Sequence, residues 1–369
     1  MSDHSPAQAD NVTMSSGGLY SLATKGAKDV IDKATPQVLE AIDRMNPEPE
    51  LSEFHMVDMG CADGGTSLQM VEAVIQKVRQ AGTETPIRVT YSDQPRNDFN
   101  ALVGIIHGIS DFDTYLNRHN NVFPSCSGAS FYLQGVPDLS VDLGFSATAM
   151  HWLSRKPCDI ANHVHMVGAS KSELQVFAEQ ARTDWETILL CRARELKPGG
   201  RLVLVNFCID PDGQYLGNTG GINMFDTFHS NWSQMLDQKR ISQHEYARMT
   251  LPQYYNTIEE FSEPLVDTDS RCYRAGLRLE KIQTAVVRCP FAAEFESDND
   301  TKNFADGLIP TIRSWNESTF LGALDPARPT DERNQLIEDY YELYRQQVLD
   351  DPSGHGMDYV HAYMTIARV

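Results

Sequence analysis

The sequence lacks long apolar runs and paired cysteines. No stretch approaches the roughly 20 consecutive apolar residues that a membrane-spanning helix needs, so we expect no membrane insertion. The seven cysteines are scattered singly, without a C-x-x-C pair or the Cys/His spacing of a zinc site. The first residues also lack the basic and apolar regions of a signal peptide. These absences predict reduced thiols and a cytoplasmic protein.

Basic residues are scarce as well. Asp and Glu outnumber Lys and Arg by 51 to 31, which gives a formal net charge of −20. A surface of that charge repels nucleic acids and anionic membranes, so we expect neither as a partner. A small anionic substrate is not excluded, because it needs only a locally favourable pocket. The length of 369 residues and the apolar share of 41% predict one α/β domain with a smaller helical addition.

Apolar periodicity alternates between strands and helices through the first 208 residues. After a helix over 28–42, the expected strands cover 54–60, 87–93, around 130–135, 139–149 and 201–208, and the expected helices cover 66–80, 100–116 and 170–196. This alternation is typical of a parallel, doubly wound sheet with helices on both faces. Ligands of such sheets bind outside the carboxyl ends of the strands.

The second half of the chain breaks this alternation. Helical patterns cover 224–249 and 300–350, and strand patterns cover 277–287 and 359–368. We predict that the last two strands close a seven-stranded, mainly parallel sheet as an antiparallel pair, under an α-helical cap. The predicted division has a lid over the site at 1–50, an α/β core at 51–211, 271–298 and 357–369, and the cap at 212–270 and 299–356.

A glycine-rich turn between a strand and a helix is the strongest local signal. It reads Val57-Asp-Met-Gly-Cys-Ala-Asp-Gly-Gly-Thr66. Glycine allows a tight turn and the close approach of a cofactor, and the helix N-terminus offers unpaired N–H groups. The same spacing also occurs in structural loops, so the turn alone is only moderately specific.

A carboxylate follows at the end of the next strand, in Tyr91-Ser-Asp-Gln-Pro95. Asp93 could accept hydrogen bonds from both ribose hydroxyls of an adenosine-bearing cofactor, or it could cap the following helix. A nicotinamide cofactor would use the same layout. Because the G-x-G-x-x-G spacing is absent, a methyl donor is favoured.

These blocks resemble the SABATH methyltransferases, a family that includes plant salicylate, benzoate, jasmonate and theobromine methyltransferases and bacterial fatty acid methyltransferases. The matching segments occur in the family's order along nearly the whole chain: Met14–Ser21, Asp58–Gly64, Asp93–Asn100, Ser130–Tyr132, Ser146–Ser154 and Leu251–Tyr255. The D-x-P-x-N-D-F-N and H-W-L-S patterns among them are specific. The resemblance implies a Rossmann-like class I methyltransferase fold and transfer of a methyl group from S-adenosylmethionine to a carboxylate.

The resemblance also implies roles for individual residues. Cofactor contacts would fall to Tyr20, Asp58, Gly60, Cys61, Asp93, Gln94, Ser130, Phe131 and Ser146. His151 and Trp152 would form the catalytic pair that binds the acceptor, each donating to one carboxylate oxygen. Without the resemblance, such a pair after a strand more often packs in a core. No general base is required, because a carboxylate is already an ionised nucleophile at neutral pH.

Two departures from the plant members matter. Ala27 stands where they have a glutamine that helps to hold the acceptor carboxylate, so another residue or a water must replace that donor. Ala247 and Thr250 stand where some members have magnesium ligands. We therefore expect no metal.

The acceptor is expected to contact Ala27 and an aromatic wall drawn from Phe225, Phe228, Trp232, Tyr255, Trp315 and Phe320. These aromatic side chains could equally form the core of the cap. An open apolar tunnel beside Ala27 would suit a medium-chain fatty acid, which we take as the acceptor. The alternatives are an aromatic acid such as salicylate, benzoate or an indole acid, and an inactive relative that only binds S-adenosylmethionine. The family also suggests a homodimer.

Overall fold

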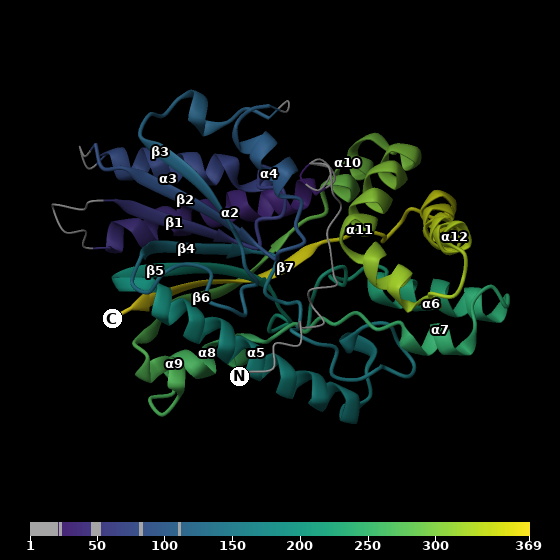
Figure 1. Cartoon of the computed structure of the whole chain (residues 1–369). Coiled ribbons are helices and arrows are strands. Elements are labelled where there is room, and N and C mark those ends of the chain that lie inside the picture. Colours follow the sequence, from purple (N-terminus) through teal and green to yellow (C-terminus); the bar gives the residue numbers. More distant parts are fainter. Residues whose placement is uncertain (1–20, 22–23, 46–52, 81–83, 110–111) are drawn as a thin grey trace.

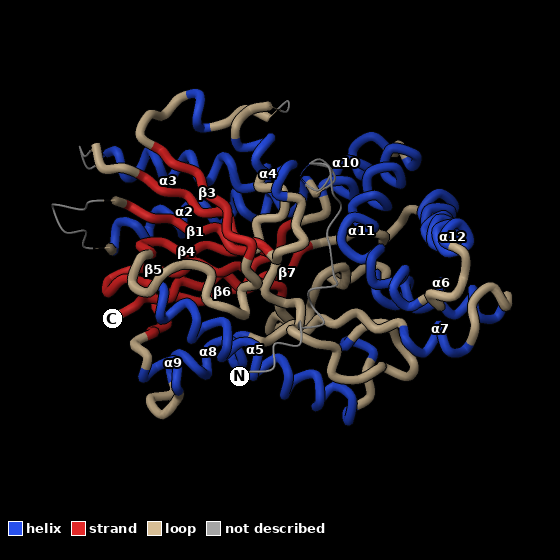
Figure 2. Tube along the Cα trace, viewed as in Figure 1, coloured by secondary structure: helices blue, strands red, loops and turns tan. Residues whose placement is uncertain are grey.

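The sheet has the predicted architecture. The structure is a computed structural model that describes residues 21, 24–45, 53–80, 84–109 and 112–369. Within these residues one seven-stranded sheet has the order β3-β2-β1-β4-β5-β7-β6 (Figures 1 and 2). Its strands are β1 (Phe54–Met59), β2 (Ile87–Asp93), β3 (Val122–Gly128), β4 (Val141–Ala147), β5 (Leu196–Phe207), β6 (Leu277–Val287) and β7 (Tyr359–Arg368). Strand β7 runs antiparallel to both β5 and β6, whereas the other neighbouring strands are parallel.

Helices cover both faces of the sheet. On one face lie α2 (Lys25–Arg44), α3 (Leu68–Gln80) and α4 (Phe99–Ile106), and on the other lie α5 (Lys171–Glu195), α8 (Ile258–Val266) and α9 (Arg271–Arg274). Strand β5 shows the division, because Val203 and Val205 pack into the first layer and Leu202 and Leu204 into the second. A strand that is buried on both faces reads as a continuous apolar run, which is why the sequence revealed it.

The remaining helices gather beyond one end of the sheet (Figure 1). They are α6 (Met224–Asp237), α7 (Gln243–Arg248), α10 (Pro290–Asp298), α11 (Thr301–Ala323) and α12 (Thr330–Asp350). Aromatic side chains fill the space between them: the ring centroid of Trp232 lies 5.3 Å from that of Phe320 and 5.8 Å from that of Tyr340. These helices form the cap.

The division into lid, core and cap stays a prediction, and three helices bear on it. Helix α2 belongs to the range assigned to the lid but packs against α3, β5 and β7. Helix α8 belongs to the range assigned to the cap but packs against β6 and α5. Helix α10 belongs to the range assigned to the core but packs against α11. No helix in the described ranges is both long and apolar enough to cross a membrane.

Three expected elements differ from the structure. The third strand covers 122–128, and 130–135 forms a turn after it. Strand β3 is at the edge of the sheet and its side chains are partly exposed, so it lacks the apolar run of a central strand. The helix expected over 100–116 ends at Ile106, shortly before Gly108 takes a φ of +64°. The helix expected over 224–249 is two helices, because Ser242 begins α7 with a capping box.

Candidate active site

The glycine turn lies where the carboxyl ends of β1, β2 and β4 meet. Gly60 donates its N–H to the carbonyl of Ser92 at 2.7 Å, and the Ser146 hydroxyl donates to the carbonyl of Met59 at 2.8 Å. Gly60 has a φ of +74°, and a Cβ on it would lie 2.4 Å from the Cβ of Ala149. Only glycine therefore fits at this position without moving the loop that follows β4.

Asp93 holds this turn from the end of β2. Its Oδ2 accepts from the Ala62 N–H and its Oδ1 from the Gln94 N–H, each at 2.7 Å. Burial raises the pKa of Asp93, and the two backbone N–H groups act in the opposite direction. Each carboxylate oxygen keeps a further lone pair. The side chain can thus fix the turn and still accept two ligand hydroxyls.

Asp58 lies deeper, at the end of β1. It is buried and accepts a hydrogen bond from the Ser67 hydroxyl at 2.7 Å. Burial raises its pKa to about 7, and the nearby charge of Asp93 adds to that effect. Asp58 therefore titrates near neutral pH.

A small cavity opens under this turn, which we call the turn cavity. Its volume is about 20 Å³, and its lining comprises Ala27, Ile31, Asp58, Gly60, Cys61, Thr66, Ser67, Phe145, Ala147 and Thr148. A second cavity, the His-Trp cavity, has a volume of about 30 Å³. It is lined by Thr24, Ala27, Thr148, His151, Trp152, Phe207, Leu216, Gln253, Trp315, Met357 and Tyr359. Because Ala27 and Thr148 line both, the two cavities adjoin at these residues.

Thr148 is strained at this junction. Its φ is +57°, a left-handed conformation that β-branched residues rarely adopt. Two contacts hold Thr148 in this conformation. Its N–H donates to the carbonyl of Val205 at 2.8 Å, and its Oγ1 lies 3.2 Å from Nε2 of His361.

His151 and Trp152 follow directly after this junction and are both buried. The His151 ring meets the Phe207 ring edge-on at 4.7 Å, and its Nδ1 is buried with no hydrogen-bond partner among the described residues. Burial lowers the pKa of His151 to about 3, so the ring is neutral at physiological pH. The carbonyl of Trp152 accepts from the Tyr132 hydroxyl, which holds the backbone in place.

The other predicted acceptor residues divide into two groups. Ala27 and Trp315 line the His-Trp cavity, whereas Phe225, Trp232 and Tyr255 are not among its described lining residues. Trp232 belongs to the aromatic core of the cap described above. The Phe225 ring stacks on His165 at 3.8 Å, and the Tyr255 hydroxyl donates to Oε1 of Gln253 at 3.1 Å.

The remaining predicted cofactor residues come from several segments of the chain. Tyr20 lies outside the described residues. Cys61 lines the turn cavity, and Ser130 and Phe131 are half-buried in the turn after β3. At the positions of the plant magnesium ligands, the Thr250 hydroxyl accepts from the Ile160 N–H at 3.0 Å. Over the described ranges, no group of three or more His, Cys, Asp or Glu residues could hold a metal ion.

Sequence reasoning missed several lining residues of the His-Trp cavity, namely Thr24, Thr148, Phe207, Leu216, Gln253, Met357 and Tyr359. Thr148 and Gln253 fall inside blocks that carried the resemblance, and their position there was the available signal. The others come from distant loops and strands that only the fold brings together.

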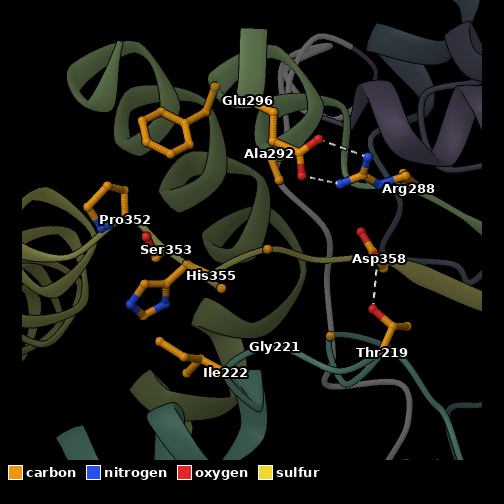
Figure 3. Close-up of a pocket in the computed structure, with 14 residues that line it drawn as sticks. Thr219, Gly221, Ile222, Arg288, Ala292, Glu296, Pro352, Ser353, His355 and Asp358 are labelled. Carbon is orange, nitrogen blue, oxygen red and sulfur yellow. Dashed lines mark hydrogen bonds and ion pairs between the residues drawn. The ribbon is translucent and has the colours of Figure 1, made fainter. Parts of the chain in front are cut away.

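Figure 3 shows a larger hollow, whose volume is about 410 Å³. Its lining includes the ion pair between Arg288 and Glu296, and Asp358, which accepts from the Thr219 hydroxyl at 2.7 Å. Leu216 and Met357 line the His-Trp cavity, whereas their chain neighbours Gly217, Gly356 and Asp358 line the hollow. The two therefore approach each other at these two segments of the chain.

Comparison with known proteins decides the family. The model of a family described as SAM-dependent carboxyl methyltransferases, where SAM is S-adenosylmethionine, matches residues 12–320. The chain belongs to this family. It is 26% identical over 307 residues to a probable S-adenosylmethionine-dependent methyltransferase of Arabidopsis thaliana, which covers 78% of this chain and 80% of that protein. It is also 26% identical over 255 residues to farnesoic acid carboxyl-O-methyltransferase of the same plant, covering 65% and 69%.

A solved structure confirms the class I methyltransferase fold. A loganic acid methyltransferase with S-adenosylhomocysteine superposes with a TM-score of 0.74 at 20% identity, covering 96% of this chain and 98% of that one. The predicted fold, the family resemblance and the S-adenosylmethionine-dependent enzyme class are thus confirmed. The site of this carboxyl methyltransferase also fits the cofactor, because Asp93 presents a carboxylate beside the glycine turn.

Proposed function

We propose that this methyltransferase forms methyl esters of small apolar carboxylic acids and prefers medium-chain fatty acids. The observation that supports the proposal is the junction at Ala27 and Thr148, which joins the glycine turn to the cavity of His151 and Trp152. A cofactor at the turn and an acid beside the His-Trp pair would face each other across that junction.

The bound cofactor supplies an electrophilic methyl group on a sulfonium. The chain's own task is to hold the acceptor oxygen about 3 to 3.5 Å from that methyl carbon. Trp152 and neutral His151 can each donate one hydrogen bond to the acceptor carboxylate, and neither has to remove a proton. The transfer turns two charges into neutral products. Buried aromatic walls that exclude water, such as Phe207 and Trp315, therefore favour it.

The shape of the site favours a chain over a ring. A cavity of about 30 Å³ accommodates little more than one water molecule, or the carboxylate itself. The body of the acid must therefore displace part of the wall. We take Leu216 and Met357 as that part of the wall, because they line the cavity while their chain neighbours line the hollow of about 410 Å³. A single methylene chain needs a narrower gap between these two side chains than an aromatic ring bonded directly to the carboxylate.

The test is methyl-ester formation from labelled S-adenosylmethionine across straight-chain acids from about C4 to C14, beside salicylate, benzoate and indole-3-acetate. The expected result is the highest kcat/KM within the straight-chain series. A maximum among the aromatic acids would replace the fatty-acid assignment with the aromatic one. Binding of S-adenosylhomocysteine without ester from any acid would identify an inactive relative.

Two further properties are retained as proposals. The family resemblance suggests a homodimer, and the composition of the sequence suggests a cytoplasmic location. Sedimentation of the purified chain at micromolar concentration tests the first, and localisation of a tagged chain in its native cell tests the second.

A further inference from the structure

We propose that Gln253 anchors the acceptor, with its Nε2 donating a hydrogen bond to one carboxylate oxygen beside His151 and Trp152. The inference rests on the proposed function, because it assumes a carboxylate in the His-Trp cavity. It assigns the main neutral donor of the site to a loop residue between α7 and α8.

The first observation is a hydrogen-bond donor of Gln253 that has no partner. Gln253 is fully buried and lines the His-Trp cavity. Its Nε2 has no hydrogen-bond partner among the residues that the structure describes. Buried amide donors are nearly always paired, and leaving one unpaired is costly, so a bare Nε2 at a cavity wall indicates a partner that arrives with the ligand.

The second observation fixes which end of the amide is free to bind. The Tyr255 hydroxyl donates to Oε1 of Gln253 at 3.1 Å. Burial raises the pKa of Tyr255 well above its usual value, so this phenol keeps its proton and remains a donor. The amide oxygen has a second lone pair, and the His165 side chain also interacts with this amide, but Nε2 is the atom that is left without a partner.

The third observation places Gln253 beside Trp152. The two residues form an antiparallel β-bridge, flanked by hydrogen bonds from the Leu153 N–H to the Pro252 carbonyl at 2.8 Å and from the Tyr254 N–H to the His151 carbonyl at 2.9 Å. Side chains of directly opposed residues in an antiparallel pair lie on the same face. The backbone therefore holds the amide and the indole side by side on the cavity wall.

Ala27 forms another part of the cavity wall. It lines the same cavity with a methyl group only, so it offers no donor to a carboxylate. Besides the Gln253 amide, the ring nitrogen Nδ1 of His151 is also buried and has no hydrogen-bond partner among the described residues. A carboxylate in this cavity would meet neutral donors only, which orient it without forming an ion pair that would hold its charge too strongly for transfer.

The experiment compares Gln253→Met, an apolar residue of similar length, with Gln253→Glu in the full-length enzyme. Gln253→Met should raise the acceptor KM by about 10- to 100-fold, the loss expected for one hydrogen bond to a charged group. The dissociation constant of S-adenosylhomocysteine should change less than twofold. Gln253→Glu should lose more at pH 8, because it places a second anion beside the acceptor, and should recover as the pH falls toward 6 and the buried Glu is protonated.

Two controls separate a carboxylate anchor from a structural role. Gln37→Met replaces another buried glutamine, which bonds Thr365 at 2.8 Å outside the site, and should leave the acceptor KM unchanged. Tyr255→Phe removes only the hydroxyl that orients the amide and should raise KM by a few-fold if the fold is kept.

The outcomes distinguish this inference from the proposed function. If the wild-type enzyme forms esters and Gln253→Met keeps its KM within threefold, the anchor is wrong while the function stands. Equal losses in the Met and Glu variants with no recovery at low pH would also overturn the anchor and make Gln253 a packing residue. Absence of ester from the wild-type enzyme with every acid would overturn the proposed function itself.

Discussion

Ala27 and Thr148 line both the turn cavity and the His-Trp cavity, so a methyl group and a strained threonine bound the proposed path between cofactor and acceptor. A methyl group can cross only if this junction stays open. The size of the side chain at position 27 should therefore control the rate of transfer.

We predict that Ala27→Leu lowers kcat/KM for any acid at least tenfold. Leucine suits helix α2 as well as alanine does, and overpacking at one buried site costs about 1–3 kcal/mol, so the fold should persist. Circular dichroism and steady-state kinetics check both statements. Ala27→Ser adds a single atom and should retain most activity. A leucine variant as fast as the wild type would show that the junction is not the path of transfer.

Asp93 should determine the affinity for the cofactor. Asp93→Ala removes the proposed charge-assisted hydrogen bonds to the ribose, each worth roughly 1.5–3 kcal/mol, and also frees the Ala62 N–H of the turn. We expect the dissociation constant of S-adenosylhomocysteine, measured by calorimetry, to rise at least 100-fold. Asp93→Asn keeps one acceptor oxygen, so its dissociation constant should lie between those of the wild type and the alanine variant. Unchanged affinity in the alanine variant would contradict the assignment of Asp93 to the cofactor.

His151 should make the protein sensitive to acid. Its pKa is about 3 in the folded chain against 6.5 for an exposed histidine. Below pH 6.5, His151 binds a proton in the unfolded chain but stays neutral in the folded chain. The stability that is present above pH 6.5 is therefore lost as the pH falls toward 3. We predict that His151→Gln loses less melting temperature between pH 7 and pH 5 than the wild type. The exposed His107→Gln is the control. Parallel losses in wild type and His151→Gln would show that His151 takes up its proton at the same pH in the folded and the unfolded chain.

The central sheet could be predicted from the sequence, because strands that are buried on both faces appear as continuous apolar runs. Asp58 and Asp93 lie at the carboxyl ends of β1 and β2, and the carboxyl ends of parallel strands meet at one edge, so the proximity of the turn and the Asp93 carboxylate could be expected. Edge strand β3 was misplaced for the opposite reason, since its exposed face leaves no apolar run.

The aromatic residues of the cap illustrate what sequence could not resolve. Their periodicity shows that Trp232 and Trp315 are buried, but not what covers them. Tertiary packing places Trp232 against Phe320 and Tyr340, and Trp315 beside the His-Trp cavity. Gln253 carried no signal of its own, because an unpaired amide is visible only once its neighbours are in place.

Chain-length preference should depend on Met357, which lines the His-Trp cavity between two residues that line the larger hollow. Met357→Trp thickens this wall, so we predict at least a tenfold lower kcat/KM for acids of about ten carbons, with butyrate and hexanoate changed less than threefold. Met357→Ala removes part of the wall and should shift the optimum toward longer acids. Val266→Trp, at an exposed position on α8, controls for the added ring. The same chain-length profile in both Met357 variants and the wild type would mean that the acceptor tail leaves the site by another route, because a side chain in its path must alter the space that the tail can fill.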